Sequence, residues 1–170
     1  ATAMTPPTTP DGVAGHSVGE IAALVAAGVL SDDDGMRLVG IRGRAMADAA
    51  AAAQTGMSAI IGGDRDAVLA RLDELELTPA NHNGAGQIVA AGTLDALEAL
   101  AASPVAGTRV IPLQVAGAFH TRFMTPAVDA LRDAAARIEA SDPTLTLWSN
   151  SDGEPAPPGR PPPDRPVPQA

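Results

Sequence analysis

The spacing of hydrophobic and polar residues changes along the chain, and each change predicts a new element. Apolar residues at helical spacing predict a helix over residues 17–27, ended by Gly28, which suits the left-handed position after a helix. Ser31 and, three residues later, Asp34 resemble a capping box and predict a second helix that runs to about residue 53. The folded part is therefore expected to open with two consecutive helices.

Shorter strand and helix signals alternate in the middle of the chain. Their order is strand, helix, strand, strand, helix, strand, at residues 58–62, 64–74, 77–82, 87–91, 93–102 and 109–113. This βαββαβ order is that of the split βαβ or ferredoxin-like unit. A helix over 125–140, capped by Thr125 and with Pro126 at its first position, and a strand over 145–148 follow it. The predicted fold class is α/β, with a small α/β module inserted in a larger body.

Both ends of the chain depart from this pattern. Residues 1–12 hold three prolines and few apolar side chains, which predicts an irregular arm. Eight of the fourteen residues from 155 to 168 are proline, which opposes a helix or a central strand and favours an extended, solvated tail. The folded part is therefore expected at residues 13–152.

Charge and composition exclude several classes of function. A net charge of −9 and a pI near 4.6 argue against nucleic acid as a partner. No apolar run reaches the length of about 18 residues that suggests a membrane span, and the start of the sequence lacks the features of a signal peptide, so a cytoplasmic location is expected. The chain has no Cys and no Lys, which excludes thiolate nucleophiles, cysteine zinc sites and Schiff-base lysines. Covalent catalysis would need Ser, Thr or a carboxylate.

Ser17 stands in the spacing Gly15-x-Ser17-x-Gly19, which matches a nucleophile elbow. In such an elbow the sharp turn from a strand into a helix needs glycines beside the serine so that backbone segments can pack closely. Apolar Val13 and Ala14 precede the motif, a predicted helix follows it, and N–H groups at a helix start can stabilise an oxyanion. The same pattern is compatible with Ser17 as a helix N-cap.

A serine nucleophile needs a base, and the chain has three histidines. His16 is adjacent to Ser17, and neighbours on a turn point in different directions, so a role in the turn is expected for it. His82 stands in a loop between two predicted strands, where a solvated turn role is expected. His120 stands where the chain leaves the inserted module and returns to the body, so it is the candidate base, with a structural histidine as the alternative.

Arg42 lies in the middle of the second predicted helix, with Leu38 and Met46 four residues to either side on its own face. The planar guanidinium of an arginine suits a carboxylate. The alternative is an arginine whose stem covers the core while its head group reaches water.

Four segments together resemble a known family. The segment "GHSVGE" at 15–20 is similar to the nucleophile motif of the malonyl-CoA:acyl carrier protein transacylase family, the acyltransferases of fatty acid and polyketide synthesis. "RGRAM" at 42–46 resembles its carboxylate-binding helix, "ANHNGAGQIVAAG" at 80–92 the strand pair of its inserted module, and "VAGAFHT" at 115–121 its histidine motif. The order and spacing of the four segments fit the family over residues 13–152.

The resemblance implies the domain organisation. A hydrolase-like α/β body is expected over residues 13–55 and 117–152, and a ferredoxin-like βαββαβ subdomain is expected as an insertion over 56–116. An irregular arm over 1–12 and a proline-rich, disordered tail over 153–170 complete the chain.

The resemblance also implies a reaction, the transfer of a malonyl group from malonyl-CoA to the phosphopantetheine thiol of acyl carrier protein in fatty acid biosynthesis. Ser17 would be the nucleophile and His120 the base, while Arg42 would pair with the free carboxylate of the malonyl group. The N–H of Val18 would donate to the oxyanion, and Phe119 resembles the malonyl-type members. The family needs no metal and no permanently bound cofactor.

The resemblance stops before the ends of the family pattern. Members begin with a strand and a Gly-Gln-Gly loop, whose Gln backbone gives the second oxyanion donor, and nothing before Val13 matches these features. They continue past the region of Asn150, whereas here the match decays into the proline-rich tail. The chain is therefore expected to lack the N-terminal and C-terminal parts of the family. Since loss of one oxyanion donor typically costs about 10²- to 10³-fold in kcat, its activity alone is an open question.

Two other functions stay open. A serine esterase of the α/β-hydrolase class shares the elbow but has no use for Arg42. The second alternative is a catalytically impaired fragment that still binds carrier protein, with scattered arginines such as Arg122, Arg132 and Arg137 as its docking charges. The carrier protein could also belong to a polyketide pathway.

Overall fold

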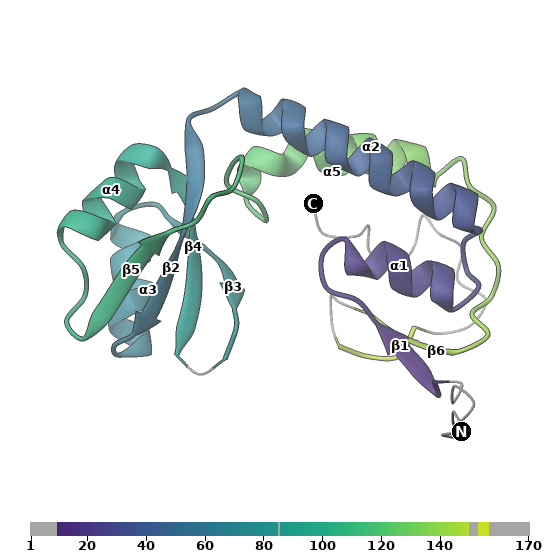
Figure 1. The fold of residues 1–170 in the computed structure, drawn as a ribbon, viewed down its shortest axis with the longest axis horizontal. Helices are drawn as coiled ribbons and strands as arrows, with labels where there is room; N and C mark the ends of the chain where they lie inside the picture. Colours follow the sequence, from purple (N-terminus) through teal and green to yellow (C-terminus); the bar gives the residue numbers. More distant parts are fainter. Residues whose placement is uncertain (1–9, 85, 150–152, 157–170) are drawn as a thin grey trace, which may run out of the picture. The chain divides into compact units, whose positions relative to one another are not determined.

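The structure, a computed structural model, describes residues 10–84, 86–149 and 153–156. These residues form two compact units (Figure 1). The terminal unit contains residues 10–41 and the described residues from 131 onward, and the central unit contains Arg42–Ala130. Both units combine helices with strands, which confirms the predicted α/β class.

The terminal unit contains a short parallel pair of strands. β1 (Gly12–Ala14) runs parallel to β6 (Thr146–Trp148), with Val13 opposite Leu147. This pair joins two segments that are more than a hundred residues apart in the chain, so it is a product of tertiary packing.

Most of the two predicted irregular ends lies outside the described residues, which leave out 1–9 and 157–170. The described start of the predicted tail, residues 153–156, lies beside β6, where Pro155 forms an isolated antiparallel bridge with Trp148. These four residues are therefore part of the terminal unit.

The first helix of the terminal unit is α1 (Gly19–Ala26), which begins two residues later than the predicted helix. It ends before Gly28, as predicted, and the φ of Gly28 is +73°. The carbonyl of Ala27 accepts hydrogen bonds from the N–H of Thr144 at 2.8 Å and from its hydroxyl at 3.0 Å. These two bonds hold the segment before β6 against the end of α1.

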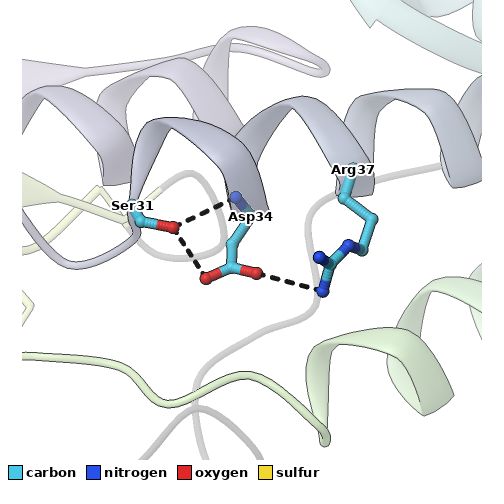
Figure 2. A network of polar contacts seen from close by, with 3 residues as sticks. All are labelled: Ser31, Asp34 and Arg37. Carbon is cyan, nitrogen blue, oxygen red and sulfur yellow. Dashed lines mark hydrogen bonds and ion pairs between the residues drawn. The ribbon is translucent and has the colours of Figure 1, made fainter.

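The second helix, α2 (Asp32–Ala51), begins with the predicted capping box (Figure 2). The Ser31 hydroxyl donates to Oδ2 of Asp34 at 2.7 Å and accepts from the Asp34 N–H at 3.1 Å, and Asp34 also pairs with Arg37 at 3.3 Å. An exposed ion pair contributes about 0–1 kcal/mol, whereas a helix cap contributes about 0.5–2 kcal/mol. The cap is therefore the larger of the two contributions to the start of α2.

The terminal unit has two buried apolar clusters, which join α1, the start of α2, the end of α5 (Thr125–Ala135) and β6. One cluster contains Ile21, Leu30, Leu38 and Leu131, and the other contains Ala23, Ala27, Val29 and Leu147. α1 contributes to both clusters, and for this reason it is fixed on two sides within its unit.

The central unit is built on a four-stranded antiparallel sheet with the strand order β3-β4-β2-β5. Its elements in chain order are β2 (Thr55–Gly62), α3 (Arg65–Glu74), β3 (Thr78–His82), β4 (Gln87–Thr93), α4 (Leu94–Ala102) and β5 (Thr108–Pro112). β2 begins three residues earlier than predicted, because Thr55 pairs with Thr93 across the sheet.

The two faces of this sheet are covered by different segments (Figure 1). One face packs against α3 and α4 through Ile60, Val68, Leu72, Ile88, Ala90, Leu97 and Leu100. The other face carries Met57, Val89 and Ala91, which pack against Ala118 and, at the edge of the cluster, Phe119 and Phe123. The segment that contains His120 therefore lies against the face of the sheet that α3 and α4 leave open.

The predicted bounds of the last helix are wrong. A short 3₁₀ helix, η1 (Arg122–Met124), precedes it and is capped by Thr121. Thr125 is the first residue of α5 rather than its cap, since its φ of −50° and ψ of −44° are helical, and its hydroxyl donates to the carbonyl of Arg122 at 2.8 Å. α5 ends at Ala135, five residues before the predicted end, in a turn with shorter-range backbone bonds.

Candidate active site

Ser17 lies between β1 and α1, and its φ is +56°. Figure 1 shows the turn that joins these two elements. A left-handed φ is strained for a residue that has a side chain, at a cost of about 1–3 kcal/mol. Val18 occupies the N-cap position of α1, one residue after Ser17, which contradicts the alternative of Ser17 as an N-cap. A strained serine between a strand and a helix has the geometry of a nucleophile elbow.

The two glycines of the motif differ in their surroundings. A Cβ at Gly15 would collide with the carbonyl group of Gly19, so the backbone on the two sides of Ser17 can approach only because residue 15 is glycine. A Cβ at Gly19 would meet nothing within 4 Å outside its own helix. Close packing therefore explains Gly15 but not Gly19.

The start of α1 supplies backbone donors beside the serine. The N–H groups of Gly19, Glu20 and Ile21 donate to carbonyls three residues earlier, at 3.0, 3.1 and 3.2 Å. Among the described residues, the Val18 N–H makes no backbone hydrogen bond. A backbone donor directly after the nucleophile can stabilise the oxyanion that forms in acyl transfer.

His120 lies in the segment between β5 and η1, and its φ is +59°. The residue is half-buried, and its Nδ1 atom is buried. His120 therefore has the same unusual backbone conformation as Ser17, with an imidazole that is partly shielded from water.

The other two histidines have different surroundings. His16 is exposed in the turn before Ser17, where its carbonyl accepts from the Gly19 N–H. His82 is exposed and is the last residue of β3, as in the predicted strand over 77–82, so it stands at the edge of the predicted loop rather than within it. Neither has the partly buried setting of His120.

Arg42 lies in α2 and is buried, with 7% of its surface exposed. This burial, which includes the Nε atom, argues against the alternative in which its head group reaches water. Burial also lowers the pKa of the Arg42 guanidinium, because removing the cation from water disfavours the charged form. A buried cation is favourably balanced by a bound carboxylate, which is the ligand class predicted for it.

The central unit brings the helix of Arg42 and the segment of His120 together. Met46, Ala49 and Ala50 of α2 form a buried cluster with Met124 and Ala127, and Phe119 packs at its edge. Phe119 also packs at the edge of the cluster on the open face of the sheet. It therefore packs at the edge of both clusters, next to His120.

The predicted site residues are divided between the two units. Ser17 and Val18 belong to the terminal unit, whereas Arg42, Phe119 and His120 belong to the central unit. The pairing of Ser17 with His120 stays a prediction.

Within its described residues, the chain has no group of three or more His, Asp or Glu side chains that could hold a metal ion. None of the described helices is long and apolar enough to cross a membrane.

Two residues that the sequence patterns did not single out contact the segment of His120. Thr55 accepts a hydrogen bond from the Ala118 N–H, and Thr121 donates one to the Ala118 carbonyl. Thr121 stands next to His120 in the sequence and could have been noticed there. Thr55 stands 65 residues away, and the only local signal for it is a polar residue at the start of an apolar strand.

The comparisons with known proteins agree on one family. The chain matches the family model described as acyl transferase domain over residues 3–161. Malonyl CoA-acyl carrier protein transacylase of Mycobacterium bovis is 60% identical over 143 residues, which cover 84% of this chain and 47% of the relative. The protein of the same name from Bacillus subtilis is 38% identical over 149 residues, with 84% and 47% covered.

Solved structures agree with these relatives. The crystal structure of MCAT from Mycobacterium tuberculosis is 59% identical and has a TM-score of 0.81, and the match covers 85% of this chain and 48% of that one. The chain spans about half the length of the curated relatives it matches. One conclusion follows from these matches, and it agrees with the strained turn at Ser17, the left-handed φ of His120 and the burial of Arg42. The chain belongs to the acyl transferase domain family.

Proposed function

We propose that this chain carries the nucleophile, the base and the carboxylate site of an acyl carrier protein S-malonyltransferase of fatty acid biosynthesis. The observation that carries the proposal is the left-handed Ser17 in the turn from β1 into α1, in a chain 60% identical to a malonyl CoA-acyl carrier protein transacylase. A serine in such a turn projects its hydroxyl away from the backbone and toward a substrate.

In the first half of the proposed reaction, malonyl-CoA is the acyl donor. Oγ of Ser17 attacks the thioester carbonyl carbon while the imidazole of His120 takes the hydroxyl proton. The Val18 N–H stabilises the oxyanion of the tetrahedral intermediate. The carbon–sulfur bond then breaks, the CoA thiolate takes the proton from His120, and a malonyl-serine ester remains.

In the second half, the phosphopantetheine thiol of acyl carrier protein is the acceptor. His120 takes the thiol proton, the thiolate attacks the ester carbonyl, and the oxygen of Ser17 takes the proton back as it leaves. One solved relative is titled as a type II PKS acyl-carrier protein in complex with its malonyl-transacylase, which supports a carrier protein as the partner. That chain is 33% identical and has a TM-score of 0.78.

The proposed role of Arg42 is to bind the free carboxylate of the malonyl group. A buried guanidinium presents paired donors to a carboxylate, and an acetyl group offers no such partner. The burial of Arg42 favours this reaction over that of an esterase for neutral esters, which would not need a buried cation.

The proposed fold follows the same family. The βαββαβ order of the central sheet and its strand order support a ferredoxin-like subdomain over 56–116, inserted in a hydrolase-like body over 13–55 and 117–152. We place the reaction in the cytoplasm, and each step moves only protons and an acyl group, so it requires no permanently bound cofactor.

The proposal is tested by the intact mass of the chain after brief incubation with malonyl-CoA. We expect a malonyl adduct on the wild-type chain and none on Ser17→Ala. His120→Asn is expected to slow formation of the adduct by at least about 10²-fold, the typical contribution of a general base. A folded wild-type chain that forms no adduct, or an adduct that persists in Ser17→Ala, would overturn the proposal.

A further inference from the structure

Thr55 is one of three polar residues that are buried among the described residues, together with Arg42 and Ser58. It is the first residue of β2, and 8% of its surface is exposed. Its hydroxyl oxygen accepts a buried hydrogen bond from the N–H of Ala118, at 3.1 Å. This bond connects the start of the central sheet to a residue two positions before His120.

The segment of residues 117–121, which we call the His120 loop, is held on its other side by Thr121. The hydroxyl of Thr121 donates to the carbonyl of Ala118 at 2.6 Å, and it also accepts from the N–H of Phe123 at 3.3 Å. Ala118 itself is completely buried. Both backbone polar groups of this buried alanine are therefore satisfied by threonine hydroxyls, one from β2 and one from the loop itself.

Packing places the His120 loop against Thr55. A Cβ at Gly117 would lie 2.8 Å from Cβ of Ala50 and 3.3 Å from Oγ1 of Thr55, so the backbone of the loop reaches Thr55 only because residue 117 is glycine. The side chain after Ala118, that of Phe119, packs against the cluster that contains Met46 of α2 and against the cluster on the open face of the sheet. The loop is thus fixed at both of the residues that lead into His120.

The left-handed φ of His120 explains why such fixing matters. A residue with a side chain keeps this conformation only where its surroundings outweigh the strain. The Ala118 N–H has no route to water at a completely buried residue, so loss of its acceptor would favour a rearrangement of the loop. Any such rearrangement would move the imidazole of His120.

We infer that Thr55 is a positioning residue, which holds the His120 imidazole in its place by accepting the hydrogen bond of the Ala118 N–H. The inference rests on the proposed function for the role of His120 as a base, but its structural content concerns the loop alone. It assigns to a residue at the start of β2 a role in positioning the proposed base.

The test compares Thr55→Val, which keeps the shape but removes the acceptor, with Thr55→Ser, which keeps the hydroxyl. Thr78→Val is the matched control, because it makes the same change in β3 of the same sheet, opposite Ala91, but does not remove the acceptor of the Ala118 N–H. NMR measures the amide exchange rate of Ala118 and the pH titration of the His120 imidazole in each folded variant. His120→Asn assigns the imidazole signal.

We expect Thr55→Val to accelerate exchange of the Ala118 amide by about tenfold or more, and to shift the titration midpoint and chemical shifts of His120. Thr55→Ser should restore both properties, and Thr78→Val should leave both unchanged. A general loss of stability would not be rescued in this way, because it would affect amides throughout the sheet in every variant.

Adduct formation with malonyl-CoA separates this inference from the proposed function. If the wild-type chain forms no adduct but Thr55→Val alters the His120 signal, the proposed function fails and the positioning role stands. If Thr55→Val leaves the Ala118 exchange and the His120 signal unchanged, the positioning role fails, whatever the adduct shows. Should Thr55→Val not fold, Thr55→Ala removes the same acceptor, and an unchanged His120 signal there would overturn the inference.

Discussion

Backbone strain at single residues marks the candidate site. Ser17, Glu76 and His120 are the residues other than glycine that have a left-handed φ in the described part of the chain. Two of the three are the predicted nucleophile and the predicted base, and the third lies in the turn after α3. Strained residues persist where the surrounding structure determines them, and they are concentrated at functional sites. This conformation is therefore a second, independent reason to single out Ser17 and His120.

The first prediction at this scale concerns Arg42. Replacement by Met should reduce the preference for malonyl-CoA over acetyl-CoA, because the buried guanidinium is the proposed partner of the malonyl carboxylate. A hydrogen bond to a charged group contributes about 1.5–3 kcal/mol, so the preference should fall by about 10- to 150-fold. The ratio of the rate of adduct formation with malonyl-CoA to that with acetyl-CoA measures this preference.

Arg44→Met is the matched control, because Arg44 lies on the same helix and is exposed. The preference of this variant for malonyl-CoA over acetyl-CoA should stay at the wild-type value. Equal losses of preference in the two variants would mean that Arg42 acts through general charge rather than as the carboxylate site.

At the scale of elements, the turn from β1 into α1 depends on one close backbone approach. The peptide at Gly15 lies so near the carbonyl of Gly19 that a side chain has no room, and this approach brings the chain round from the strand into the helix. The turn is further closed by the bond from the Gly19 N–H to the His16 carbonyl at 3.0 Å. The conformation of Ser17 is therefore a property of the whole strand, turn and helix.

We predict that Gly15→Ala destabilises the chain, whereas Gly19→Ala does not. The added methyl group at residue 15 would force the backbone apart, at a cost of about 1–3 kcal/mol for such overpacking. At residue 19, at the start of α1, the methyl group has space, and alanine is a better helix former than glycine by up to about 1 kcal/mol. Urea unfolding followed by circular dichroism measures both, and equal destabilisation by the two would contradict the role assigned to Gly15.

At the scale of the whole molecule, each unit has a core made of its own residues. In the central unit the largest cluster lies between the sheet and the helices α3 and α4. The opposite face of the same sheet carries the His120 loop. The sheet is therefore the common support of the central core and of one part of the candidate site.

Leu72 tests the contribution of this core. It is 1% exposed in α3, and replacement by Ala should cost about 2–5 kcal/mol, the usual range for removing a buried leucine side chain. Leu113 is 37% exposed just after β5, and its replacement by Ala should lower the free energy of unfolding by less than about 1 kcal/mol. Denaturant unfolding of the two variants gives the comparison, and a similar loss for both would show that the cluster around Leu72 is not the main core.

Local signals in the sequence determined most of the elements, because each depends on residues within a few positions of one another. The capping box at Ser31 and the stop at Gly28 gave correct helix limits, and the alternation in the middle of the chain gave the order of the strands and helices. The motif around Ser17 also pointed to the turn that the structure contains. The roles assigned to Ser17, His120 and Arg42 remain predictions that the structure and the relatives support.

The tertiary structure decided the features that depend on distant parts of the chain. Thr55 belongs to β2 because it pairs with Thr93, and its hydroxyl reaches Ala118, which is 63 residues away. The position of Arg42 in α2 left open whether this residue is exposed, and the folded chain buries it. Spacing along a chain records neighbours within a turn or a strand, whereas burial and long-range hydrogen bonds depend on which segments the folded chain brings together.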